Sequence, residues 1–280
     1  MKPKVTVLVT IYNHEKYIGR CIRSLLSQKI DKKLFEIIII NDASTDSSES
    51  IIDVFRNDIT YMKNKKRIGL PGSLNLGIKN IKTPYFVRVD SDDYVNENFL
   101  GYLINFIEYN KYKDAVAVDY YLVNENEEIL ERVNCLERPI GCGIIFRSDQ
   151  IVKLGMYDKE FLLHEDKDLM RRFLKKYEVS RLELPLYKYR QHDGNITKNK
   201  KFDIKFKKKL LNKLINNKNK LKLFKLYGIK FNENDNFNTL FNGFLFIKNI
   251  KKFEIFFLEN IHNIKNLNES NNDQVFKFIY

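Results

Sequence analysis

Short apolar runs alternate with amphipathic stretches through the first half of the chain. Residues 5–12 and 35–40 are almost wholly apolar and rich in Val and Ile, a pattern typical of strands that are buried on both faces. Residues 16–28 carry apolar side chains at every third or fourth position, as an amphipathic helix does. Strands and helices in this order require right-handed crossovers. The pattern therefore predicts an α/β fold around a central, mostly parallel sheet.

Polar side chains follow these strands at the points where the strands end. Asn13 comes directly after the first apolar run, Asp42 comes shortly after the second, and residues 90–93 follow an apolar strand that ends at Val89. In an open parallel sheet, ligands bind beyond the carboxyl ends of the strands. We therefore expect these polar side chains to gather around one binding site at one edge of the sheet.

Three carboxylates lie within four residues at the last of these strand ends, at Asp90, Asp92 and Asp93. Residues two apart in an extended chain face the same side, about 6–7 Å apart, so Asp90 and Asp92 can point together. Like charges at that spacing oppose each other's ionisation unless a cation lies between them. A divalent cation completed by substrate phosphates would supply that charge. The alternative is an acidic turn that caps the next helix, with Asp93 or Asn96 near its N-terminus.

A glycine-rich segment at residues 67–78 precedes this cluster and contains a helix start. Its glycines and the helix N-terminus suit a close approach to a phosphate or a ribose. A plain turn is the alternative interpretation of the same glycines.

The second half predicts a smaller set of elements and a second acidic pair. Residues 115–123 and 129–133 flank a polar stretch and predict a hairpin, and residues 141–147 predict a strand that is entered through glycine. Glu165 and Asp166 begin a stretch with helical character. Two acids there are either a charged helix N-terminus, which the helix dipole favours, or part of the binding site.

The last candidates lie in residues 187–197, which follow a predicted strand. His192 is solitary, and a solitary histidine is either a surface residue or a ligand of the site. Neighbouring Arg190 has the planar group that pairs with a diphosphate.

Length and composition fit one large α/β domain with an appendage. The 280 residues contain no apolar run near the roughly 18 needed to cross a bilayer. The early apolar run at 5–12 lacks a cleavage site, so we interpret it as a strand and not as a signal peptide. Cys21, Cys135 and Cys142 have neither an even count nor metal-ligand spacing, which predicts reduced thiols and a cytoplasmic setting.

The net charge of +13 is concentrated in the last part of the chain. From residue 200 onward there are 17 Lys, no Arg and 7 acids, a net charge of +10, whereas the remainder has 32 basic and 29 acidic residues. The absence of Arg, the residue that reads base edges, argues against nucleic acid as a partner. We predict a catalytic domain over residues 1–198 and a basic, mostly helical extension over 199–280. The extension either packs on the domain or rests on anionic lipid at the inner face of the cell membrane.

Four motifs in the first hundred residues match in order and spacing, and together they resemble the signature of family 2 glycosyltransferases. They are residues 5–13, then Asn41-Asp42-x-Ser44-Thr45-Asp46, then Gly69 with Asn75-x-Gly77, then Asp90-x-Asp92-Asp93. The resemblance implies a GT-A fold, a Rossmann-like nucleotide-diphospho-sugar transferase fold. Residues 1–100 would form its nucleotide-sugar-binding half and 101–198 its acceptor-side half. One departure is Asn41-Asp42, where the family usually has an acidic pair.

The same resemblance implies a role for each candidate residue. Asp166 matches the general base, with Glu165 beside it, and Mg²⁺ or Mn²⁺ is the implied cofactor. The implied metal ligands are Asp92, Asp93 and His192, and the implied donor-binding residues are Thr10, Tyr12, Asn13, Asp42, Gly69, Asn75, Asp90, Ser91 and Arg190.

These residues predict a metal-dependent inverting glycosyltransferase. The family favours a UDP-sugar donor and a glycan or lipid-linked acceptor in the assembly of surface polysaccharide or oligosaccharide. A nucleotidyltransferase is an alternative, but residues 13–16 lack the Gly-rich basic loop that it would have after its first strand. A non-catalytic protein that binds glycan or nucleic acid would explain the basic extension but not the two acidic clusters.

Overall fold

The computed structural model describes residues 2–195, 206 and 209. The chain divides into two units, Met1–Ile196 and Thr197–Tyr280. The predicted extension at 199–280 lies outside the described residues apart from positions 206 and 209, so its packing and its helical character stay predictions.

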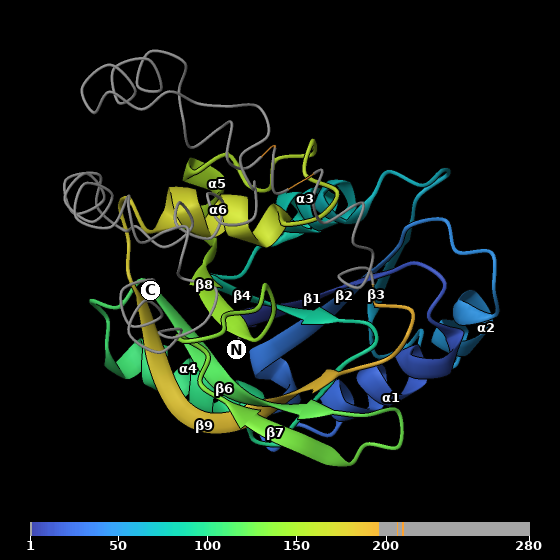
Figure 1. Ribbon diagram of the computed structural model, residues 1–280, viewed down its shortest axis with the longest axis horizontal. Helices are drawn as coiled ribbons and strands as arrows, with labels where there is room; N and C mark the ends of the chain where they lie inside the picture. Colours follow the sequence, from blue (N-terminus) through green and yellow to red (C-terminus); the bar gives the residue numbers. More distant parts are fainter. Residues whose placement is uncertain (1, 196–205, 207–208, 210–280) are drawn as a thin grey trace, which may run out of the picture. The chain divides into compact units, whose positions relative to one another are not determined.

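The described part of the chain forms an α/β unit in which strands and helices alternate through the first half (Figure 1). Its strands are β1 Val5–Ile11, β2 Phe35–Asn41, β3 Thr60–Lys63, β4 Tyr85–Asp90, β5 Tyr94–Val95, β6 Ala115–Val123, β7 Ile129–Val133, β8 Ile144–Arg147 and β9 Val179–Arg190. Its α-helices are α1 Glu15–Leu26, α2 Ser48–Asp53, α3 Leu70–Asn80, α4 Phe99–Tyr109, α5 Ser148–Lys153 and α6 Glu165–Phe173, and a short 3₁₀ helix spans Lys32–Leu34.

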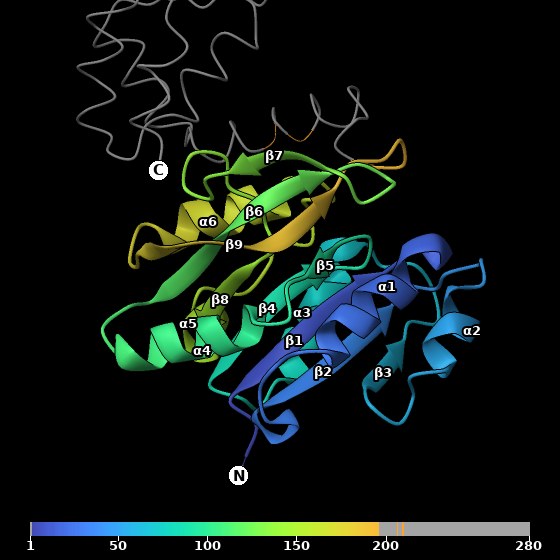
Figure 2. The same ribbon diagram turned by 90° about the horizontal axis from the view of Figure 1, so that it is seen from below.

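The strands join in one mixed sheet with the order β3-β2-β1-β4-β8-β6-β9-β5, and β7 pairs with β6 (Figure 2). The first four of these strands are parallel to one another. Each antiparallel pair includes a strand from the second half of the chain. The predicted α/β class is therefore confirmed, and β6 with β7 forms the predicted hairpin.

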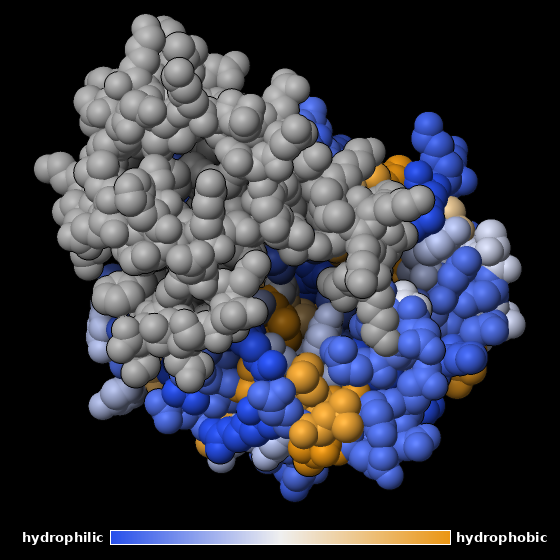
Figure 3. All heavy atoms as spheres, viewed as in Figure 1, coloured by the Kyte–Doolittle hydropathy of each residue, from blue (hydrophilic) through white to orange (hydrophobic). Residues whose placement is uncertain are grey.

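Helices cover both faces of the sheet, with α3, α5 and α6 on one side and α1 and α4 on the other (Figure 1). Every residue of β1 is buried, as its almost wholly apolar sequence predicts for a central strand. The three cysteines are free and buried. Figure 3 shows a mostly hydrophilic visible surface with a small apolar patch over β7, where Ile129 and Leu130 are exposed.

Gly77 lets α3 lie directly against the sheet. A methyl group built at this position would overlap Leu8 of β1 and approach Ile40 Cδ1 of β2 to 2.8 Å. We expect Gly77→Ala to lower the free energy of unfolding by about 1–3 kcal/mol, because overpacking outweighs the gain in helix propensity. Urea unfolding measures the difference. The matched control is Gly19→Ala in α1, where the nearest atoms are 3.3 Å from the added carbon; equal unfolding midpoints for the two variants would contradict this packing.

Candidate active site

The carboxyl ends of three parallel strands meet at one edge of the sheet. Thr10 of β1 is in register with Ile40 of β2 and with Asp90 of β4. The polar segments that leave these strands therefore start side by side, as the sequence predicted. Thr10 itself is buried.

Asp42, which follows β2, holds the loop between β3 and α3. Its carboxylate accepts hydrogen bonds from the side chain of Asn64 at 2.8 Å and from the backbone N–H groups of Ile68 and Gly69 at 2.9 and 2.8 Å. Gly69 has a φ of +82°, a conformation that glycine adopts without strain. The carboxylate of Asp42 thus fixes the glycine-rich loop, and its implied role in donor binding stays a prediction.

Tyr12 and Asn13 lie at the end of β1 beside this loop. The Arg67 guanidinium sits 3.7 Å from the centre of the Tyr12 ring, at cation–π distance. The Asn13 side chain accepts a hydrogen bond from the backbone N–H of Thr45 at 2.8 Å. Arg67 is exposed and was not among the predicted site residues. A cation beside an aromatic ring at the strand ends suits an anionic, ring-bearing ligand such as a nucleotide.

Arg88 connects the two acidic motifs of the sequence. Its guanidinium holds both carboxylate oxygens of Asp90, at 2.6 and 3.1 Å, and donates to Glu165 at 2.8 Å. Arg88 and Glu165 are buried, whereas the Asp90 side chain is 25% exposed. Burial raises the pKa of Glu165 to about 7 in spite of this ion pair. The buried Arg88 side chain therefore joins one acid at the strand ends, Asp90, to one acid of the second pair, Glu165.

Asp166 begins helix α6 next to Glu165. It is half-buried. No hydrogen bond joins its carboxylate to another residue in the part of the chain that the structure describes. His164, which precedes the helix, adopts a left-handed φ of +63°. The Asp166 carboxylate is thus available to a bound hydroxyl group.

Asp92 pairs with His192, which comes from the segment after β9. The His192 Nε2 atom lies 2.9 Å from Asp92 Oδ2. Burial opposes ionisation of Asp92, but the hydrogen bond from His192 and the nearby ring of His14 lower its pKa. His14 in turn lies 2.7 Å from the hydroxyl of buried Ser91. An ionised carboxylate beside an imidazole is a suitable pair of ligands for a divalent cation.

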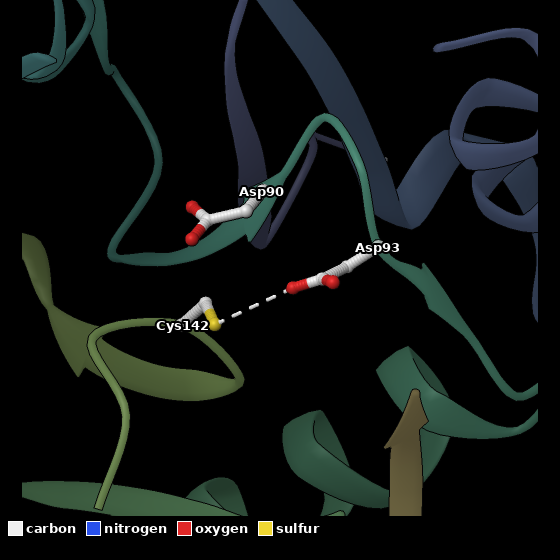
Figure 4. Close-up of side chains that lie close together, drawn as sticks. All are labelled: Asp90, Asp93 and Cys142. Atoms are coloured by element: carbon white, nitrogen blue, oxygen red, sulfur yellow. Dashed lines mark hydrogen bonds between the residues drawn. The ribbon is translucent and has the colours of Figure 1, made fainter. Parts of the chain in front are cut away.

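Asp93 faces the protein interior (Figure 4). One oxygen accepts the backbone N–H of Arg190 at 2.8 Å, and the other accepts the hydroxyl of Tyr187 at 2.7 Å and the thiol of Cys142 at 3.9 Å. Burial, followed by the charges of Asp92 and Asp90, raises the pKa of this carboxyl. A metal role for Asp93 stays a prediction; its hydrogen bonds favour a role in holding the loop.

Cys142 lies close to Asp90 and Asp93, and the ligand atoms of the three residues are within 4.8 Å of one another. Burial and the charges of these aspartates raise the pKa of the thiol. Because a metal binds the thiolate and not the thiol, this cluster is a poorer cation site than Asp92 with His192.

Arg190 and Asn75, both predicted to bind the donor, are buried and have their side-chain groups bonded inside the protein. Arg190 donates to the backbone oxygens of Asp92 and Glu125 and to the carboxylate of Glu127, at 2.9–3.1 Å. Asn75 makes two hydrogen bonds with the backbone of Tyr157, at 2.7 and 2.9 Å. Their arrangement favours positioning roles, and direct donor contacts stay predictions.

The raised pKa of Glu165 predicts a pH dependence of stability. The folded chain keeps a proton on this carboxyl up to about pH 7, whereas the ordinary value is 4.5. The resulting stabilisation is complete below pH 4.5 and is lost as the pH rises through 7. Over that window we expect the free energy of unfolding to fall by up to about 3 kcal/mol more in the wild type than in Glu165→Gln. Urea unfolding at several pH values measures this, and parallel curves for the two proteins would contradict it.

The mixed sheet, with helices on both of its faces, has the architecture of the GT-A class of α/β folds. The profile of the family described as "Glycosyl transferase family 2" matches residues 6–168. The chain belongs to this family, and the resemblance found in the sequence is confirmed. In the described part of the chain, no helix is both long and apolar enough to span a membrane.

Relatives and solved structures agree with this assignment. A glycosyltransferase of Rickettsia typhi is 29% identical over 213 residues, which cover 70% of this chain and 66% of that protein. The poly(ribitol-phosphate) β-N-acetylglucosaminyltransferase TarS of Staphylococcus aureus is 34% identical over 124 residues, 43% of this chain and 22% of that protein. The chain thus spans less than two thirds of the length of these relatives.

Structures of TarS share the fold. A TarS fragment in complex with UDP-GlcNAc has a TM-score of 0.65 at 18% identity, over 97% of this chain and 77% of that one. A mannosyltransferase from Pyrobaculum calidifontis, in complex with GDP-Man and Mn²⁺, has a TM-score of 0.57 at 15% identity, over 70% of this chain and 59% of that one. The GT-A fold predicted from the sequence is confirmed.

Proposed function

We propose that this chain transfers a sugar from a nucleotide-diphosphate donor to a hydroxyl group of a glycan or lipid-linked acceptor, with inversion at the anomeric carbon. The observation that carries the proposal is the buried Arg88 side chain, which ties Asp90 at the strand ends to Glu165, the neighbour of Asp166. This contact keeps a donor-side acid and an acceptor-side acid at one site, as direct transfer requires.

The donor would lie across the ends of β1, β2 and β4. Its base would contact Tyr12 and Asp42, its ribose would contact Asp90, and Arg67 is near enough to Tyr12 to close over the base. Uridine is the first choice, since TarS, a relative with the same fold, was solved with UDP-GlcNAc. Guanosine is the second, since the Pyrobaculum enzyme was solved with GDP-Man.

Asp92 and His192 would hold Mg²⁺ or Mn²⁺. Their donor atoms, a carboxylate oxygen and an imidazole nitrogen, face each other at 2.9 Å, and the lowered pKa of Asp92 keeps its carboxyl ionised, so the pair fits a divalent cation. A bound cation would neutralise the charge that develops on the departing nucleoside diphosphate. No protein acid is then needed to protonate the leaving group.

Asp166 would act as the general base. Its carboxylate removes the proton from the acceptor hydroxyl while that oxygen attacks the anomeric carbon from the face opposite the leaving group. A single displacement inverts the configuration, so no side chain has to form a covalent intermediate. Glu165 supports this step by holding the start of α6 to Arg88.

The acceptor is proposed from chemistry and from relatives. TarS is named as a transferase that acts on poly(ribitol phosphate). The last 81 residues of this chain carry a net charge of +10, which favours an anionic acceptor or an anionic lipid surface. We therefore propose a role in surface polysaccharide or oligosaccharide assembly at the inner face of the cell membrane.

A panel of nucleotide sugars tests the proposal. Each donor is incubated with the full chain, with Mn²⁺ and with EDTA, and release of the nucleoside diphosphate is measured. We expect one or two donors, UDP-GlcNAc first among them, to be hydrolysed slowly with Mn²⁺ and at least tenfold more slowly with EDTA. Hydrolysis of none of them in either condition would contradict the proposal.

A further inference from the structure

Gly141, which lies in the loop that enters β8, occupies the space between Arg88 and the predicted base. A β-carbon built on Gly141 would lie 2.7 Å from Asp166 Cβ, 3.3 Å from Asp166 Cγ and 3.1 Å from Arg88 Nη1. Real β-carbons do not approach other heavy atoms as closely as 2.7 Å. The side chains of Asp166 and Arg88 therefore occupy positions that are open to them only because residue 141 has no side chain.

The conformation of Gly141 does not explain why glycine is needed here. The glycines of the described chain with positive φ are Gly69, Gly143 and Gly155, so the backbone of Gly141 lies outside the left-handed region. An alanine would meet no backbone penalty of that kind. The constraint is one of space.

The same loop is attached to Arg88 through the backbone. The N–H of Gly143 donates to the carbonyl oxygen of Arg88 at 3.0 Å. The Arg88 guanidinium then reaches Asp90 with both ends of its fork and Glu165 with its remaining nitrogen. The start of α6, the loop and the end of β4 are thus fixed by contacts that converge on Arg88 and Gly141.

We propose that Gly141 and Arg88 are positioning residues for the transfer step, which set the Asp166 carboxylate at its working distance from the donor held at Asp90. The inference rests on the function proposed above. Neither residue needs to touch the substrate. A misplacement of about 1 Å in a reacting group costs on the order of 10²-fold in rate. A single methyl group at position 141 should therefore lower kcat more than it weakens donor binding.

The test compares Gly141→Ala with Gly19→Ala, a glycine in α1 whose added carbon would have only 3.3 Å contacts. For Gly141→Ala we expect the kcat of Mn²⁺-dependent hydrolysis, with UDP-GlcNAc as the first probe, to fall about 10–100-fold. The KM for UDP-GlcNAc and the Kd for UDP should stay within about twofold. Gly19→Ala should match the wild type in kcat.

Two further variants separate positioning from loss of structure. Gly141→Ser, with a larger side chain, should lower kcat more than Gly141→Ala. Arg88→Lys keeps the charge but loses the fork that joins Asp90 to Glu165, and it should also lower kcat. An unchanged kcat in Gly141→Ala, or a kcat loss with an equal loss of UDP binding, overturns the inference. A wild type without activity overturns the proposed function as well, whereas an active wild type with an equally active Gly141→Ala overturns only the inference.

Discussion

Replacement of Asp166 with Asn should slow sugar transfer by about two to four orders of magnitude and leave UDP binding intact. Among the described residues its carboxylate has no hydrogen-bond partner and is half-buried at the start of α6, so the amide fits the same space. What it loses is the ability to accept a proton. General-base catalysis contributes about 10²–10⁴-fold, and we expect kcat to fall by that factor with the Kd for UDP within about twofold.

Asp149→Asn is the matched control for this substitution. Asp149 lies in α5, and its side chain is 61% exposed and paired only with Lys153 in the described chain. Surface pairs of this kind contribute little to stability, so this variant should match the wild type in kcat and in UDP binding. Transfer that persists in Asp166→Asn would assign the base to another residue.

Replacement of Asp92 with Asn should weaken metal-dependent nucleotide binding. The carboxylate has a lowered pKa and faces the His192 imidazole. The amide keeps the shape but removes the charge that balances a divalent cation. Loss of groups that support a metal site typically costs 10–100-fold in affinity, so we expect the Kd for UDP with Mn²⁺ to rise by at least about tenfold.

EDTA supplies the control for Asp92→Asn. Without a divalent cation, the wild type and the variant should bind UDP with similar, weak affinity, because the lost charge then has no cation to hold. Calorimetric titration measures both conditions. The same Kd for both proteins in Mn²⁺ would refute the metal role of Asp92.

The strands that build the site could be predicted because runs of apolar residues indicate buried strands. Residues 5–12 and 35–40 are almost wholly apolar runs, and β1 and β2 lie there. Parallel neighbours end at the same edge, so the polar residues that follow them could be placed together without knowledge of any side-chain contact.

The partners of the site residues could not be predicted in this way. Arg88 and Glu165 are 77 positions apart, and Asn75 and Tyr157 are 82 apart, and neither hydrophobic period nor turn chemistry relates residues at such separations. One signal did exist: Arg88 is a charged residue inside an apolar strand, and a buried charge calls for a partner. The spatial role of Gly141 could not be predicted, because the sequence shows only that position 141 is a glycine.

The direct test of a nucleotide-sugar site at these strand ends is a calorimetric titration of UDP into the full chain, with Mn²⁺ and with EDTA. We expect saturable binding with Mn²⁺ and binding at least tenfold weaker with EDTA. If neither UDP nor GDP binds in either condition, the strand-end acids do not form a donor site.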